Sequence, residues 1–124
     1  MTQPIRVVVA NRPKLMRELV IETIMDHADI EFIAEIQNED EIIAVVGGSH
    51  PDFLIIALDE SNQRPVLCDT LLRLYPEMRI LALAPERNRG VFYWASFGIY
   101  ETEVESSQAG ILRTLRGENE CVGG

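Results

Sequence analysis

The chain has 124 residues, of which 47% are hydrophobic and 25% are charged, a size and composition that fit one domain with its own core. Its two cysteines are too few for a disulfide framework and lack the paired spacing of a metal site. The net charge of -9 argues against direct nucleic-acid binding. No apolar run has the length of a signal sequence or a membrane span, so we expect a soluble, cytoplasmic protein without membrane contact.

Short apolar runs alternate with amphipathic segments along most of the chain. The apolar runs predict strands at residues 5–10, 32–36, 53–57, 79–84 and 99 to about 102. Apolar spacings of three and four predict helices at about 15–24, 41–46, 65–75, 90–97 and 107–115. Alternating strands and helices with short connections require parallel strands and right-handed crossovers. The predicted fold is one doubly wound (βα)5 flavodoxin-like α/β domain, a parallel five-stranded sheet in the order 2-1-3-4-5.

Capping residues set the expected ends of these helices. Asn38 precedes the second helix, which Gly47 and Gly48 should end, and Ser106 or Ser107 should cap the last helix. Pro76 should end the third helix because proline cannot continue one. The domain is expected to cover residues 1–117, followed by a flexible tail at 118–124.

The third predicted strand carries the most informative pattern. Pro51 and Asp52 precede five apolar residues, 53–57, and Leu58 and Asp59 follow them. The absence of alternation indicates that both faces of this strand are buried. The pattern resembles the third strand of bacterial response-regulator receiver domains, in which an aspartate accepts a phosphoryl group. Ala57 occupies the matching position, so the resemblance implies that the phosphoryl acceptor is missing.

The start of the chain carries a second part of the resemblance. Residues 5–18 are similar to receivers that precede helix-turn-helix DNA-binding domains, in which two acidic residues after the first strand hold Mg²⁺. Asn11 and Arg12 occupy those positions. An amide is a weak ligand and a guanidinium repels the cation, so we expect no bound Mg²⁺ and no cofactor.

Two further receiver positions are changed. Ala84 ends the fourth predicted strand where receivers carry a serine or threonine, and Thr102 or Glu103 stands where they carry a lysine. Lys14 is the only lysine of the chain. The degenerate positions are therefore Asn11, Arg12, Ala57, Ala84 and Glu103. Because phosphoryl transfer depends on positioning and charge neutralisation, we expect no enzyme activity.

Basic residues collect at the edge of the sheet where the phosphorylation site would lie. One hypothesis is that Arg12 enters the pocket in place of Mg²⁺ and pairs with Asp59 or Glu60. Alternatively, the basic residues could cradle an anion, or simply form weak surface pairs with acidic neighbours. The basic residues are Arg12, Lys14, Arg17, Arg87 and Arg89, and the acidic ones are Glu18, Asp59, Glu60 and Glu86.

An aromatic cluster suggests a partner surface. Phe92, Tyr93 and Trp94 are consecutive, and on the helix predicted at 90–97 they would span about 200° of the surface. At least one should then be exposed, near Tyr100 on the last strand. Aromatic residues are enriched at interaction hot spots. The resemblance implies the same surface, because receivers commonly bind partners or dimerise through the fourth helix, fifth strand and fifth helix.

The sequence therefore predicts a phosphorylation-independent pseudo-receiver. Its expected role is that of a regulatory protein-protein interaction module, or homodimer, in bacterial signal transduction or transcriptional control. One alternative is a sensor of a small anion or metabolite that uses the vacated pocket. Another is the regulatory half of a truncated DNA-binding response regulator.

Overall fold

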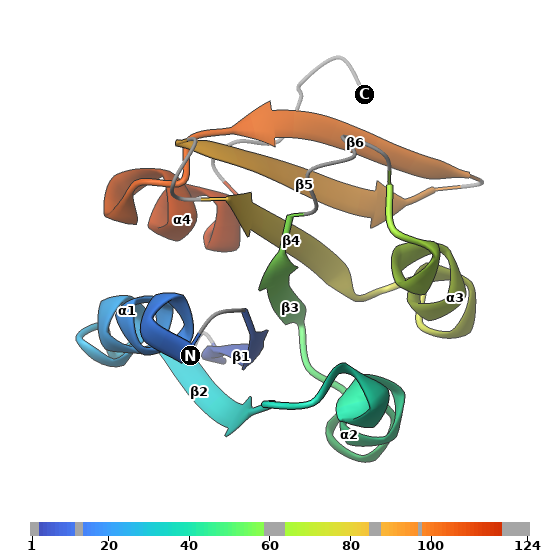
Figure 1. Cartoon of the computed structure of the whole chain (residues 1–124), viewed down its shortest axis with the longest axis horizontal. Helices are drawn as coiled ribbons and strands as arrows, with labels where there is room; N and C mark the ends of the chain where they lie inside the picture. The colour runs from blue at the N-terminus through green and yellow to red at the C-terminus, as the bar shows by residue number, and fades with distance from the viewer. Residues whose placement is uncertain (1–2, 12–13, 59–63, 85–87, 97, 118–124) are drawn as a thin grey trace.

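A computed structural model describes residues 3–11, 14–58, 64–84, 88–96 and 98–117. These residues form one six-stranded mixed sheet in the order β2-β1-β3-β4-β5-β6, with helices on both faces (Figure 1). The strands are β1 (Ile5–Ala10), β2 (Ile30–Glu35), β3 (Phe53–Ala57), β4 (Arg79–Ala84), β5 (Arg89–Ala95) and β6 (Ile99–Val104). The helices are α1 (Lys14–Met25), η1 (Glu39–Glu41), α2 (Ile42–Ser49), α3 (Val66–Leu74) and α4 (Gln108–Leu115), of which η1 is a 3₁₀ turn.

Each face of the sheet has its own hydrophobic core. Helices α1 and α4 cover one face, and α2 and α3 cover the other (Figure 1). Val7 and Val9 of β1 point to the α1 and α4 side, and Val8 points to the α2 and α3 side. This alternation follows from the period of two in an extended chain. The central strands are therefore buried on both faces, as their unbroken apolar runs predict.

Strands β1 to β4 are parallel, and the strands predicted at 5–10, 53–57 and 79–84 have those bounds in the structure. Strand β3 lies between β1 and β4, with Ala10 beside Ile56 and Ala57 beside Leu83. The prediction of a strand buried on both faces is confirmed for residues 53–56, each of which is buried. The carboxyl ends of β1, β3 and β4 consequently lie along one edge.

Several helix ends agree with the predicted caps. The Asn38 side chain accepts a bond from the Asp40 amide, and the Ser107 hydroxyl accepts one from the Gly110 amide. Helix α3 ends at Leu74, before Pro76. The longest described helix, α1, has 12 residues, and no helix in the described ranges is long and apolar enough to cross a membrane.

The predicted stop at Gly47 and Gly48 is wrong, because α2 continues to Ser49. His50 then ends the helix in a left-handed conformation, with a φ of 48°. A Cβ at Gly47 would lie 2.8 Å from the Tyr75 hydroxyl. Gly47 therefore leaves room for Tyr75 against α2 and does not end the helix.

The region after β4 overturns the predicted fold. The helix predicted at 90–97 is wrong, because β5 spans residues 89–95 and runs antiparallel to both β4 and β6. The described residues form a mixed six-stranded sheet with four α-helices, so the (βα)5 flavodoxin-like prediction with order 2-1-3-4-5 is wrong. Strand β6 is parallel to β4, as predicted for the last strand, but β5 lies between them, so β6 is one position further from β4 than predicted.

The composition of β5 explains why a strand forms there. Val91 to Trp94 are β-branched or aromatic residues, which pack well on a pleated sheet. Residue Ala84 pairs with Arg89, so the chain reverses between them, and Asn88 has the left-handed φ of 49° that asparagine tolerates. Hairpins need only short loops, whereas a parallel crossover needs a dozen residues or more. The consecutive aromatic residues alternate between the two faces of a strand.

The position of Tyr93 in β5 makes a testable prediction. Burial raises the pKa of Tyr93 to about 12 from 10.0, and burial raises the pKa of the Cys68 thiol to about 12 from 9.0. In the double variant Tyr75→Phe, Tyr100→Phe, tyrosine absorbance should therefore show one late ionisation. Both ionised forms are disfavoured in the folded state, so folding stability should be retained below pH 9 and fall as the pH rises toward 12.

Circular dichroism at each pH would establish that the chain is still folded during this titration. Ionisation of Tyr93 at its ordinary pKa in the folded variant would contradict its burial between β5 and α3.

Candidate functional site

The candidate site lies at the carboxyl edge of the parallel strands. Asn11 follows β1, Ala57 ends β3 and Ala84 ends β4. Asn11 and Ala84 are buried, and Ala57 is half-buried. In open α/β sheets, the crevice beside these strand ends is the usual place for a ligand or a reactive group. The chemistry available there depends on what these side chains already bind.

Asn11 is fully buried and serves as a link between two strands. Its Nδ2 atom donates a hydrogen bond of 3.1 Å to the carbonyl oxygen of Ile56. This bond fixes the orientation of the amide, because the opposite orientation would place two oxygen atoms against each other. Oδ1 of Asn11 has no hydrogen-bond partner among the described residues. The amide therefore connects the ends of β1 and β3, a role that a carboxylate could not fill without a proton.

A buried arginine is the second polar component of this edge. Arg17 of α1 is only 5% exposed, and its Nε atom donates to Oε2 of Glu35 at the end of β2. Its Nη1 atom donates to the carbonyl oxygen of Asn11 at 3.3 Å. One guanidinium thus joins α1, β2 and the residue after β1. Because both partners are strand-end groups, Arg17 holds the edge in place and is not directed at solvent.

Sequence reasoning placed Arg17 in a basic cluster and missed this role. A usable signal was present, because Arg17 lies three residues before Val20 and seven before Ile24. Residues at these spacings share one helix face, and Val20 and Ile24 are core residues. A buried charged residue on a core-facing stripe needs a counter-charge, which the exposed Glu35 supplies from the end of β2.

Ala57 and Ala84 contribute methyl groups where a receiver would carry a carboxylate and a hydroxyl. Neither can accept a phosphoryl group or bond to one. The backbone beside them is also committed, since the Leu58 amide donates to the Leu83 carbonyl at 2.8 Å. None of the three side chains at this edge, Asn11, Ala57 and Ala84, is therefore a nucleophile.

Glu103 lies far from these residues. It is on β6, which β4 and β5 separate from β3, so the strand spacing places it about 14 Å from the β3 end. It is exposed and forms a two-pronged salt bridge with Arg89 of β5, at 2.8 and 3.0 Å. The inserted strand thus moves this position away from the candidate site, whichever side chain it carries.

Three residues of the predicted basic group lie in the described ranges, and each pairs with an acidic residue. Lys14 lies 3.9 Å from Glu18, Arg17 binds Glu35, and Arg89 binds Glu103. Only the first of these partners is in the acidic set expected from the sequence. The Arg89 pKa is raised, mainly by its hydrogen bond to Glu103. For these three residues the arrangement is one of ion pairs and not of an anion cradle.

The proposed ion pair of Arg12 with Asp59 or Glu60 lies outside the described residues. The same holds for Arg87 and Glu86, and for the tail at 118–124.

The predicted partner residues lie on a sheet and are not equally accessible. Phe92 and Tyr93 are buried, on opposite faces of β5. Trp94 is half-buried, and Tyr100 of β6 is 49% exposed. The expected surface with a fourth crossover helix therefore does not exist in that form. Trp94 and Tyr100 are the two predicted residues that can reach a partner.

Stacked aromatic rings run from the core at β3 to the outermost strand, β6. The Phe53 and Phe92 rings lie 5.9 Å apart, those of Phe92 and Trp94 lie 5.2 Å apart, and those of Trp94 and Tyr100 lie 5.7 Å apart. We call Phe53, Phe92, Trp94 and Tyr100 the aromatic ladder. Because its inner rings are buried in the core, its outer ring is held at a fixed place on the surface.

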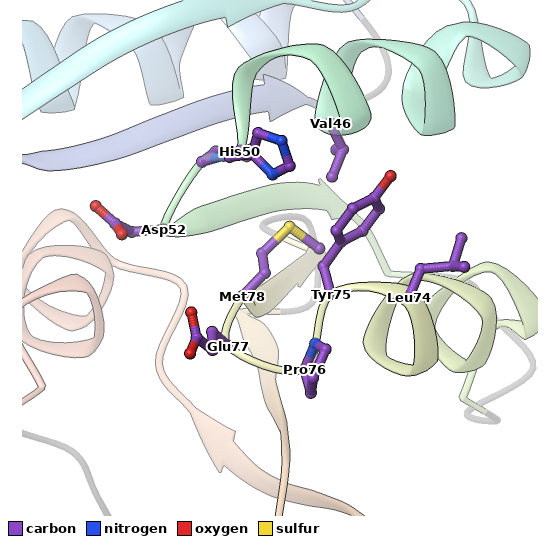
Figure 2. Close-up of a pocket in the computed structure, with 9 residues that line it drawn as sticks. Val46, His50, Asp52, Leu74, Tyr75, Pro76, Glu77 and Met78 are labelled. Atoms are coloured by element: carbon purple, nitrogen blue, oxygen red, sulfur yellow. The ribbon is translucent and has the colours of Figure 1, made fainter.

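A pocket of about 300 Å³, lined wholly by described residues, lies near the amino-terminal ends of β3 and β4, away from the candidate site (Figure 2). Val46 and Met78 form buried parts of its wall, and the His50 and Tyr75 rings meet edge to face at 5.9 Å. Asp52 and Glu77 add carboxylates from the segments that precede β3 and β4. This lining is unsuited to an anion, so the pocket does not support the anion-sensor alternative.

No protein-family model, curated protein or solved structure is significantly similar to this chain. The comparisons therefore assign no family. The fold and the side chains at the carboxyl edge are what a functional proposal has to explain.

The Asn11 link predicts a pH-dependent loss of stability in Asn11→Asp. Once ionised, the new carboxylate cannot donate to the Ile56 carbonyl, so we expect destabilisation of about 2 kcal/mol at neutral pH, measured by urea unfolding. Burial raises the pKa of the new carboxyl above its unfolded value of about 3.9. The folded state then binds more protons, so the penalty should be smallest near pH 4 and grow as the pH rises.

Asn38→Asp is the matched control, because the Asn38 oxygen is an exposed acceptor that a carboxylate can replace. Its stability should change by no more than about 0.5 kcal/mol. If Asn11→Asp is as stable as the unmodified protein at neutral pH, the Asn11 amide is not a structural link.

Proposed function

We propose that this protein is a phosphorylation-independent pseudo-receiver, a regulatory protein-protein interaction module of bacterial signal transduction or transcriptional control. It is not an enzyme, and it uses neither Mg²⁺ nor another cofactor. The observation that carries the proposal is the state of the carboxyl edge. Asn11 is committed to a backbone bond there, and Ala57 and Ala84 offer only methyl groups.

The arrangement of the first four strands supports the resemblance on which this proposal rests. They are parallel in the order 2-1-3-4, with helices on both faces, so Asn11, Ala57 and Ala84 lie at one edge as they would in a receiver. The Arg17 and Glu35 pair supports a fixed edge, because separating it would leave a buried guanidinium without a counter-charge. A fixed edge fits a module whose state does not depend on phosphate.

The aromatic ladder supports an interaction role. Its exposed end at Tyr100 lies beside Trp94, and aromatic side chains held rigidly at a surface lose little entropy on binding. The proposed partner surface is therefore the β5 and β6 part of the sheet and not a crossover helix. Either a second copy or another protein could bind there.

The variant Ala57→Asp should remain unlabelled by acetyl phosphate and Mg²⁺. A new carboxylate at position 57 would still lack acidic residues at positions 11 and 12 and a hydroxyl at position 84. The only lysine of the chain, Lys14, begins α1 and lies 3.9 Å from Glu18, so the lysine that receivers carry after their fifth strand is absent. Intact mass measurement would detect the added phosphoryl group, with a receiver that has an intact acceptor aspartate labelled in parallel. Stoichiometric labelling of the variant would show that the site is still functional.

Molar mass from light scattering tests the proposed independence of phosphate. The mass at two protein concentrations should be the same with and without Mg²⁺ and beryllofluoride, because Asn11, Ala57 and Ala84 offer no carboxylate or hydroxyl to hold the mimic. Any mass change that requires the mimic would overturn the proposed function.

A further inference from the structure

Strand β6 is an exposed edge of the sheet. It pairs only with β5, so the backbone on its outer side has no strand partner among the described residues. Its six residues extend over about 20 Å, enough for a peptide strand to pair along it. An edge of this kind is a template for strand addition unless the protein blocks it.

One face of β6 is acidic. Glu101 and Glu103 lie opposite Tyr93 and Val91 of β5, so both project to the α2 and α3 side of the sheet. Both are exposed. Glu103 pairs with Arg89, whereas Glu101 makes no direct salt bridge with a described residue and acts on Arg64 and Arg89 only through longer-range attraction. The first exposed residue beyond this strand, Glu105, adds a further negative charge.

The other face of β6 is aromatic and apolar. Tyr100, Thr102 and Val104 project to the α1 and α4 side, where Tyr100 stacks on Trp94 and Val104 packs against the core. An added strand would thus meet carboxylates on one face and an aromatic platform on the other. Successive residues of a strand point to opposite faces, so its side chains must alternate in character.

From this arrangement we propose that β6 binds an extended segment of a partner protein by strand addition, and that lysine or arginine alternates with apolar residues in that segment. This inference rests on the proposed function and names its partner class. The basic side chains pair with Glu101 and Glu103, and the apolar ones cover Tyr100 and Trp94. The net charge of -9 attracts such a segment over longer distances.

Repulsion between like charges argues against a second copy of the chain as the preferred occupant. Pairing two β6 strands edge to edge would bring Glu101 and Glu103 of one copy close to those of the other. Like charges across adjacent strands are destabilising. The opposite edge, β2, is a poorer template because its pairing with β1 is irregular between Val7 and Val8, and irregular edges resist strand addition.

The test uses the complete chain and a capped peptide in which lysine alternates with valine over the length of β6. Titration calorimetry should show binding that weakens as salt is added. Amide resonances of residues 99–104 should shift, and their hydrogen exchange should slow. The same peptide methylated at every backbone nitrogen keeps its charges but cannot donate to β6, so it should bind at least about tenfold more weakly.

A matched pair of charge reversals locates the site. Glu101→Lys should weaken peptide binding about tenfold, because it replaces an attraction with a repulsion. Glu31→Lys makes the same change of net charge on the exposed side of the other edge strand, β2, and should leave binding near the unmodified value. Thermal unfolding of both variants would establish that they are folded.

Four results would each overturn the inference. Three of them are no binding of the lysine peptide at low salt, equal binding of its methylated form, and equal effects of Glu101→Lys and Glu31→Lys. The fourth is protection of the β6 amides by self-association alone, with a second copy as the occupant. None of these results involves a phosphate mimic, so each leaves the proposed function to its own test.

Discussion

The antiparallel pairing of β5 with β4 is the constraint on which the rest of the molecule depends. It places Phe92 and Trp94 on one face of the sheet and Tyr93 on the other, so one short strand supplies aromatic residues to both cores. It also moves β6 one position outward, which separates Glu103 from the ends of β1 and β3. As the outermost strand of the described sheet, β6 carries acidic residues on one face and the end of the aromatic ladder on the other. One choice of strand direction thus affects both the candidate site and the proposed partner surface.

At the carboxyl edge, structural contacts occupy the positions where reactive groups would be expected. The Asn11 amide holds the end of β3, and Arg17 joins α1 to the end of β2 through Glu35. Removing Glu35 would leave the buried Arg17 guanidinium without its counter-charge. Conversion of this edge to a phosphorylation site would therefore require more than a new aspartate. The buried amide and guanidinium would first have to give up contacts that keep the strand ends together.

The sequence predicts the parallel part of the fold well because its signals are local and consistent. Apolar runs at 7–10, 53–57 and 80–84 predict β1, β3 and β4, and Ser107 and Asn38 have the chemistry of helix caps. The carboxyl ends of parallel strands necessarily share one edge, so Asn11, Ala57 and Ala84 could be expected to lie close together. The helix predicted at 90–97 conflicts with β5, because the regular alternation of strands and helices favours a helix there while the β-propensity of Val91 to Trp94 favours the strand that forms. The partner of Arg17 could not be predicted, because the meeting of α1 with the end of β2 depends on tertiary packing.

Nuclear Overhauser contacts of residues 89–104 with one another and with β4 test the central claim most directly, because β5 as an antiparallel strand determines both the core and the exposed edge. Antiparallel pairing predicts Hα to Hα contacts at alternate pairs of the β4–β5 and β5–β6 registers, together with slow amide exchange for Val91 to Trp94. Contacts between residues three and four apart over 90–97, without cross-strand contacts to β4, would indicate a helix and would contradict it.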